Sequence, residues 1–149
     1  MRENRETGKD GMDMSDKADP LRALVVDTKK INREQLAAIL QGKVLLDLQS
    51  NTFLLQPEAK SRGTARHAVL LSLLARKAIC LLKEGDLDAP PDGLTPLELT
   101  SATGIRGNTI RPVVRRLNAE GLVMQVQGRY VVHNSAIGRV AIVLTEPEV

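Results

Sequence analysis

The stretch of sequence that decides the fold is LTPLELTSATGIRGNTIRPVVRRLNAEG, residues 94–121. Its first part carries a complete signal for the start of a helix. Thr95 is placed to cap the helix, Pro96 takes the first helical position, and Glu98 can return a hydrogen bond to the cap. Glycine is common directly after the last turn of a helix. We therefore expect a short helix that ends at Gly104.

A second helix is predicted to follow almost at once. We expect it to begin near Arg106 or Gly107, to continue to Ala119, and to be followed by Gly121 after its last turn. Pro112 falls early in this helix, where a missing amide costs less than in the middle. Two helices joined by a tight glycine turn form a helix-turn-helix, whose second helix recognises DNA.

The second helix has chemically different faces. Its apolar residues, which should anchor it to the core, are Ile110, Val113, Val114 and Leu117. Another face carries Gly107, Arg111, Arg115 and Asn118, with Asn108 beside the first turn. Arg111 and Arg115 are four residues apart, so both guanidinium groups can fork onto guanine edges or phosphates. Gly107 lets DNA approach the positive end of the helix dipole. A solvated helix face is the ordinary alternative, but almost no acidic partner accompanies these arginines.

Two short alternating runs, 122–126 and 129–133, follow around Gln127-Gly128. This pattern predicts a β-hairpin, with Arg129 at its base. Upstream, apolar residues at helical spacing predict a long helix over Thr64–Glu84, and a loop follows over residues 86–93. The apolar arc of that long helix is too wide for one face. We therefore expect it to be covered from two sides, by an N-terminal hairpin, a dimer partner, or both.

The run of residues 104–123 resembles the recognition-helix signature of winged-helix regulators, and is particularly similar to the PadR and MarR-like groups. In those groups a Thr, a branched residue, an early Pro, an Arg-Leu pair and Glu-Gly-Leu occur in this order, as they do here. The resemblance covers roughly Thr64 to His133. The chain departs from PadR because about sixty residues precede this part and no long C-terminal dimerisation helix follows. Oligomeric state and effector binding therefore do not carry over.

The resemblance implies a winged helix-turn-helix whose second helix faces the major groove or its phosphates, with the hairpin as the wing. Arg129 would be the contact on the wing. The candidate DNA-binding residues are Arg106, Gly107, Asn108, Thr109, Arg111, Arg115, Arg116 and Arg129.

The N-terminal half carries a second set of local signals. Asn32 is placed to cap a short helix, with Gln35 three residues later, and Gln41-Gly42 ends it. Two β-prone runs, 43–48 and 52–56, then predict a hairpin with a three-residue loop. Residues 21–26 stay ambiguous between strand and helix.

The fold class that we predict is α+β and mainly helical, a winged helix-turn-helix domain preceded by a short helix and a β-hairpin. Its parts are a disordered tail (1–18), an N-terminal helix and hairpin segment (19–60), the winged helix-turn-helix domain (61–133), and a C-terminal segment considered for dimerisation, with a frayed end (134–149).

Composition narrows the classes of function. The chain has 149 residues and a net charge of +3, but residues 94–140 hold six basic side chains against two acidic ones. Phe53 and Tyr130 are the only aromatic residues, which argues against base stacking on RNA or single strands. A single cysteine, Cys80, allows neither an internal disulfide nor a Cys-rich metal site, and the two histidines lack a ligand cluster. No phosphate loop or nucleophile motif is present, so we expect neither an enzyme nor a cofactor.

The function that we expect is sequence-specific binding of double-stranded DNA by a prokaryotic transcription regulator in the cytoplasm. The charged N-terminus and the lack of a long apolar run argue against secretion and membrane insertion. Winged-helix regulators commonly bind as homodimers, here through the apolar face of the helix over 64–84 or through residues 134–144. The operator and effector stay open. The alternative is a winged helix used as a protein–protein interaction module within a larger assembly.

Overall fold

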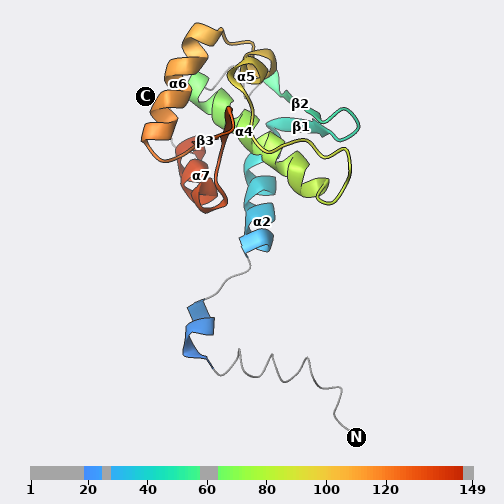
Figure 1. The fold of residues 1–149 in the computed structure, drawn as a ribbon, viewed down its shortest axis with the longest axis vertical. Coiled ribbons are helices and arrows are strands. Elements are labelled where there is room, and N and C mark those ends of the chain that lie inside the picture. The colour runs from blue at the N-terminus through green and yellow to red at the C-terminus, as the bar shows by residue number, and fades with distance from the viewer. Residues whose placement is uncertain (1–18, 25–27, 58–63, 146–149) are drawn as a thin grey trace, which may run out of the picture.

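A computed structural model describes residues 19–24, 28–57 and 64–145 of the chain (Figure 1). The predicted tail over 1–18 and the predicted frayed end at 146–149 lie outside these residues. The described part is α+β and mostly helical. Its five α-helices are α2 (Thr28–Leu40), α4 (Ala65–Leu82), α5 (Pro96–Thr103), α6 (Gly107–Ala119) and α7 (Ile137–Thr145). Its two 3-10 helices are η1 (Pro20–Leu24) and η2 (Asn134–Ala136).

The strands of the described part form two antiparallel hairpins, β1 (Val44–Asp47) with β2 (Thr52–Leu55) and β3 (Met124–Val126) with β4 (Arg129–Val131). Both hairpins were predicted, the first from two β-prone runs and the second from alternating apolar and polar residues, although their strands are shorter than the predicted runs. The loop of the first hairpin has four residues, 48–51, because Asp47 pairs with Thr52 and Leu48 already belongs to the turn. The predicted three-residue loop was therefore one residue too short.

The long helix α4 forms the centre of the molecule (Figure 1). It begins at Thr64, whose side-chain oxygen accepts a hydrogen bond from the His67 amide at 3.3 Å. On one side α4 contacts α2 and the β1–β2 hairpin, and elsewhere it contacts α5, α6, α7 and β4. The expectation that its wide apolar arc is covered from two sides is therefore confirmed. Within the described residues the chain supplies both covers itself, and the apolar side chain of α4 that stays exposed is Leu82 at its C-terminal end.

The core is aliphatic, as the scarcity of aromatic residues requires. Its buried side chains form one cluster that joins α2 and the first hairpin to the later elements: Leu36, Leu40, Val44, Leu55, Val69, Leu70, Leu73, Leu74, Leu94, Leu99, Ile110, Val114, Leu117, Val132 and Ile137. Burying one such side chain stabilises a fold by about 1.5–3 kcal/mol. The N-terminal helix and hairpin therefore share one core with α5 and α6.

The predicted start of α2 was wrong. The helix already begins at Thr28, so Asn32 lies inside it and is buried, with 7 % of its surface exposed. Nothing in residues 28–31 breaks a helix, and α2 packs against both α4 and α7, so tertiary packing outweighs the capping preference of asparagine. The predicted end after Leu40 is confirmed, and Gly42 has a φ of 78°. Of the ambiguous segment 21–26, residues 21–24 are helical, while 25 and 26 lie outside the described residues.

Candidate nucleic-acid interface

The helix α5 has an N-terminus in which its own side chains satisfy the backbone. The Thr95 hydroxyl oxygen accepts from the Glu98 amide at 3.1 Å, and the Glu98 carboxylate accepts from the Thr95 amide at 2.9 Å. This reciprocal pair is the capping box that the sequence predicts, with Pro96 in the first helical position. Gly104 ends the helix with a φ of 77°, a conformation that costs glycine little. The prediction for α5 is confirmed at both ends.

The turn into α6 is held by one threonine. The Thr103 hydroxyl donates to the Leu99 carbonyl at 2.7 Å and accepts from the Ile105 amide at 3.1 Å. Three residues, 104–106, separate Thr103 from Gly107, where α6 begins as predicted. Gly121 follows the helix with a φ of 79°, which confirms its predicted place after the last turn.

The N-terminus of α6 is open, in contrast to that of α5. Arg106 occupies the cap position but makes no side-chain capping bond. The amides of Thr109 and Ile110 bond to the Arg106 carbonyl at 3.0 Å, whereas those of Gly107 and Asn108 have no acceptor among the described residues. Unpaired amides at a helix N-terminus carry the positive end of the helix dipole. This end of α6 is therefore a local positive potential that the described protein groups leave unused.

One side of α6 anchors it and the remainder is exposed. Ile110, Val114 and Leu117 are fully buried, and Val113 is half-buried. Of the predicted site residues, the structure places seven together on α6 and its cap. We call them the exposed face of α6: Arg106, Gly107, Asn108, Thr109, Arg111, Arg115 and Arg116. All are exposed except Gly107, which is half-exposed.

The charge on the exposed face of α6 is not neutralised within the described part of the chain. None of its four arginines forms a salt bridge with a described residue. The nearest acidic residue in sequence, Glu120, lies at the far end of the helix and pairs with Arg66 at 2.6 Å. Surface arginines without an acidic partner repel one another and attract anions. The face is therefore suited to a polyanion.

Pro112 does not break α6. It is the sixth residue of the helix, so the Asn108 carbonyl loses the amide that would otherwise bond to it. Both residues are exposed, and water can satisfy that carbonyl at modest cost. The helix continues without interruption to Ala119, in agreement with the small penalty expected for an early proline.

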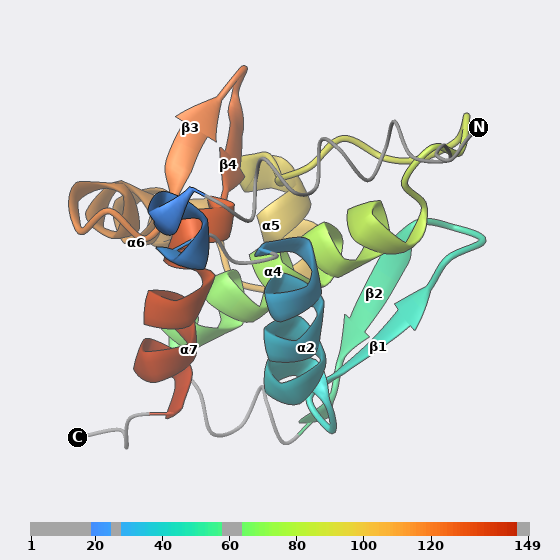
Figure 2. The same cartoon turned by 90° about the horizontal axis from the view of Figure 1, so that it is seen from below.

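The second hairpin projects from the body near α6 (Figure 2). Gln127 and Gly128 form its two-residue turn, both with positive φ, which matches the twist of the flanking strands. All three residues of β3 are exposed, whereas Tyr130 and Val131 of β4 are buried. Tyr130 exchanges two backbone hydrogen bonds with Leu94, at 2.9 and 3.0 Å. The hairpin is therefore fastened to the residue that precedes α5.

Arg129 is not where the sequence interpretation placed it. It directly follows the turn, opposite Val126, rather than lying at the base of the hairpin. Its Nη1 donates to the Glu98 carboxylate at 2.7 Å and to the Gly93 carbonyl at 3.2 Å, and its side chain is 26 % exposed. Unlike the arginines of α6, it is engaged within the protein. Local pattern gave no signal of this ion pair, because its partners are 31 residues apart.

Glu98 consequently has two structural roles. Partial burial acts to raise its pKa, but the hydrogen bond from the Thr95 amide and the charge of Arg129 outweigh burial. The pKa of Glu98 therefore lies below its ordinary value of 4.5, and the carboxylate is ionised at neutral pH. The sequence interpretation recognised only its capping role.

Gly93 is a structural residue that the sequence interpretation missed. Its φ is +87°, and a Cβ built there would lie 2.4 Å from Val131 Cγ1 and 2.8 Å from the Tyr130 carbonyl oxygen. Only glycine lets the chain pass this close to β4. The position therefore sets where α5 begins relative to the hairpin.

The thiol of Cys80 is held as a structural group rather than activated as a nucleophile. Burial is the main cause that raises the pKa of the Cys80 thiol, with the Asp92 charge second, and the thiol contacts the Pro90 carbonyl at 3.3 Å. Within residues 19–24, 28–57 and 64–145, no group of three or more His, Cys, Asp or Glu could hold a metal ion. Among the helices so described, none is long and apolar enough to cross a membrane.

Comparison with known proteins gives no match to a family model, to a curated protein or to a solved structure. The function must therefore be inferred from the chain's own residues. Those that carry the inference are on the exposed face of α6 and in the hairpin beside it.

Proposed function

We propose that residues 64–133 form a winged helix-turn-helix and that the protein binds double-stranded DNA in a sequence-specific manner, as a prokaryotic transcription regulator in the cytoplasm. The observation that carries the proposal is the exposed face of α6. It combines four arginines that have no acidic partner among the described residues with a helix N-terminus whose first two amides have no acceptor there either. The order of elements supports it: α4, a strand residue at Leu94, α5, a tight turn, α6, and the β3–β4 hairpin as the wing.

The chemistry of this face fits the major groove of B-DNA, which admits an α-helix. Arg111 and Arg115 lie one turn apart and are both exposed, so each can present a fork of N–H donors to a guanine. Asn108, near the helix start, is suited to adenine, whose edge offers one donor and one acceptor. Arg106 and the free amides at the helix start would hold a backbone phosphate.

The wing has a smaller part in this proposal. Gln127 and Gly128 form its exposed tip and would approach the DNA backbone. Arg129 contributes less than the arginines of α6, because its Nη1 is bound to Glu98. Its Nε and Nη2 have no partner among the described residues and are free to reach a phosphate.

We propose that the protein binds DNA as a homodimer, with two half-sites one helical turn apart. Since α4 is covered by its own chain, the surface that remains from the sequence interpretation is the segment after the wing. In α7, Ile137 and Val140 are buried, whereas Ile142 is 60 % exposed. We assign the exposed Ile142 side chain of α7 to the contact with the partner copy.

The test is binding of the purified protein to mixed genomic DNA fragments over a range of salt concentrations. We expect affinity to fall steeply with salt, because phosphate contacts release counterions, and a few fragments to be enriched. The variant Arg111→Glu/Arg115→Glu should bind at least about 100-fold more weakly, since two contacts become repulsive. The matched variant Arg33→Glu/Lys43→Glu makes the same change in net charge on α2 and beside β1, and should retain most of the affinity. Absence of binding at low salt would overturn the proposal.

A protein–protein interaction module is the second candidate. It is favoured by exposed apolar side chains near the proposed interface, where Leu97 of α5 is 77 % and Val126 of the wing 45 % exposed. The same double variant separates the two functions. A DNA reader loses its ligand when Arg111 and Arg115 are reversed, whereas a module that binds through Leu97 and Val126 keeps its partner.

A further inference from the structure

A groove lies between α4 and the wing, and its lining shares Gln127 and Arg129 with the proposed DNA-facing wing. Its volume is about 520 Å³, within the range of small-molecule sites. The C-terminal half of α4 forms one wall and the β3–β4 hairpin the other. The segment before α5 and the residues directly after β4 close it.

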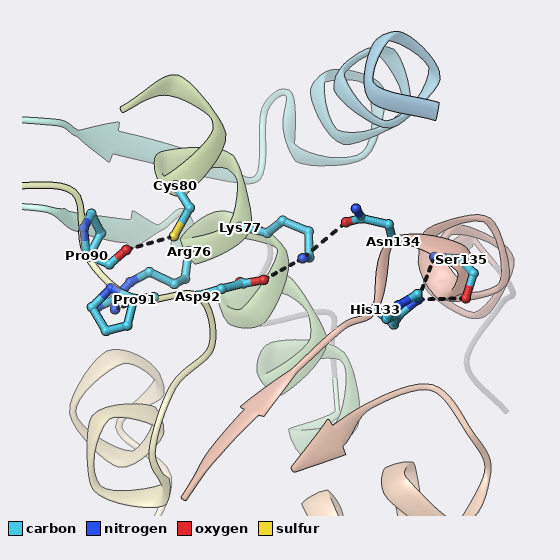
Figure 3. Close-up of polar contacts among 9 residues, drawn as sticks. All are labelled: Arg76, Lys77, Cys80, Pro90, Pro91, Asp92, His133, Asn134 and Ser135. Carbon is cyan, nitrogen blue, oxygen red and sulfur yellow. Dashed lines mark hydrogen bonds and ion pairs between the residues drawn. The ribbon is translucent and has the colours of Figure 1, made fainter. Parts of the chain in front are cut away.

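A buried lysine stands at one corner of the groove. Only 7 % of the Lys77 side chain is exposed, and its Nζ donates to Asp92 Oδ2 at 2.6 Å and to Asn134 Oδ1 at 3.3 Å (Figure 3). An ammonium group has three N–H donors. The third has no acceptor among the residues that the structure describes, and the Asn134 contact is long for a charged donor.

Another buried lysine on the same helix shows what a purely structural role requires. Lys83 Nζ donates to the Leu48 carbonyl, to Asn51 Oδ1 and to Asp88 Oδ2, at 2.7–2.8 Å. Its three donors are all used, so it fastens the first hairpin and leaves nothing for a ligand. Lys77 differs because one donor is spare and one contact is weak. This difference suits Lys77 to an additional acceptor.

The hydrogen-bond donors left unused at the groove favour an acceptor group. Arg129 also lines it, and its Nε and Nη2 have no partner in the described chain. Asp92 is the only carboxylate among the lining residues, and it pairs with Lys77, while Glu98 pairs with Arg129. The charges of these two pairs are therefore compensated, but a carboxylate that enters the groove meets unused N–H donors on both Lys77 and Arg129.

The opposite wall is apolar. Met124 and Val126 are two residues apart on β3, so they share one face of the strand, and they are 42 % and 45 % exposed. Leu81 of α4 lies across from them in the same lining, and no aromatic residue is present. This wall is suited to an aliphatic group.

We propose that this groove binds a small aliphatic carboxylate. Its carboxylate accepts from the third N–H of Lys77 Nζ, which has no acceptor among the described residues, and its chain lies against Met124 and Val126. The site does not depend on DNA binding. Since the wing forms one wall, a bound ligand also holds the wing against α4, and that consequence for DNA affinity rests on the proposed function.

The test uses hexanoate as the probe and follows the assigned amide NMR signals of the full chain without DNA. We expect saturable shifts at Lys77, Met124, Val126 and Val131, with a dissociation constant of roughly millimolar order for so small a ligand. Hexanamide, of the same length but neutral, should bind at least tenfold more weakly. Shifts that do not saturate, or equal binding of the two probes, would overturn the proposal.

Variants place the probe in the groove. Lys77→Met removes the ammonium while retaining the length of the side chain, and should weaken hexanoate at least tenfold. Because Lys77 is buried and its variant can misfold, Val126→Asp provides a second test at an exposed position. It should cause a similar loss, whereas Leu54→Asp, at an exposed position of the other hairpin, should leave binding unchanged. Hexanoate binding that survives both groove variants would refute this site.

The consequence for the wing is measured separately, as DNA affinity with and without saturating hexanoate. A change of about threefold or more that disappears in Val126→Asp supports it, and an unchanged affinity refutes it. Because hexanoate binding is measured without DNA, a protein that binds hexanoate but not DNA refutes only the proposed function. A protein that binds DNA but not hexanoate refutes only the groove.

Discussion

The helices α5 and α6 are separated by only three residues, yet their N-termini are treated in opposite ways. At α5, Thr95 and Glu98 satisfy the first amides reciprocally, and Glu98 also binds Arg129. At α6, Arg106 provides no cap, and two amides lack partners among the described residues. A helix start without a cap forgoes about 0.5–2 kcal/mol. The uncapped helix is α6, whose face is exposed, and the capped helix is α5, which binds the β3–β4 hairpin through Glu98.

The charges at α5 and α6 differ in the same way as their N-termini. The carboxylate at the start of α5 is matched by an arginine of the wing, so that end of the helix is locally neutral. The exposed face of α6 has four arginines and no described acid paired with them. The difference teaches which helix is a support and which is the proposed contact surface, because only α6 leaves donors and positive charge available to another molecule.

The largest effect on stability should come from removing the cap of α5. We expect Thr95→Ala/Glu98→Ala to lower the free energy of unfolding by about 2 kcal/mol, since two capping bonds and the ion pair to Arg129 are lost together. Arg106→Ala at the corresponding position of α6 should change it by less than about 0.5 kcal/mol, because no capping bond exists there. Urea denaturation measures both. Equal losses in the two variants would remove the contrast.

A next test gives α6 the cap that it lacks. Arg106→Asp places a good N-cap residue and a negative charge at the positive end of the helix, so stability should rise by about 0.5–1 kcal/mol. DNA affinity should fall about tenfold, because the aspartate occupies the amides and repels phosphate. Thermal unfolding and a DNA titration give the two numbers. If the cap stabilises the fold while DNA affinity stays unchanged, the start of α6 is not at the DNA.

The contribution of the Glu98 carboxylate to stability can be measured as a function of pH. Because the folded-state pKa of Glu98 lies below its ordinary value of 4.5, its ionised form stabilises the fold above that pH. This stabilisation is lost as pH falls through the lower folded-state value. Glu98→Gln should therefore lower the free energy of unfolding by about 1 kcal/mol at pH 7, through loss of the ion pair and of the charge near the helix N-terminus. The gap from the parent protein should narrow as pH falls below 4.5 and through the lower folded-state value. A gap of constant size over the whole acid range in which the protein stays folded would show that the charge of Glu98 does not matter.

Local chemistry explains what the sequence could predict. The capping box of α5, the limits of α6 and the turn at Gln127-Gly128 each depend on residues within about four positions of one another. The same signals predicted the helix on which seven of the eight candidate residues lie, and the structure shows these seven on α6 or at its cap. The predicted helix start at Asn32 was wrong, because the capping preference of asparagine is weaker than the packing that buries this residue inside α2.

The features that the sequence could not predict depend on contacts between segments that are distant along the chain. The pair of Arg129 with Glu98 joins residues 31 apart, and Lys77 meets Asn134 across 57 positions. Gly93 must be glycine because β4 passes beside it, which no neighbour in sequence indicates. The groove between α4 and the wing is made of such contacts, so it is visible only in the folded chain.

The smallest effect, and the sharpest contrast between folding and binding, is expected at Gly107. Its φ is not positive, and a Cβ built there meets only Thr100 Oγ1 at 3.9 Å and Arg111 Nη1 at 4.0 Å, which are ordinary contacts. Alanine is the better helix former, so Gly107→Ala should leave stability unchanged or raise it by up to about 0.5 kcal/mol. DNA affinity should nevertheless fall about threefold, because a methyl group keeps a phosphate from the free amides of the first turn.

The matched control is Gly138→Ala, in the first turn of α7, where a Cβ would meet Gln35 Nε2 at 3.7 Å. That variant should have the same stability and unaltered DNA affinity. An equal affinity for both variants would mean that glycine at the start of α6 serves no close approach, and that the open helix end faces solvent alone.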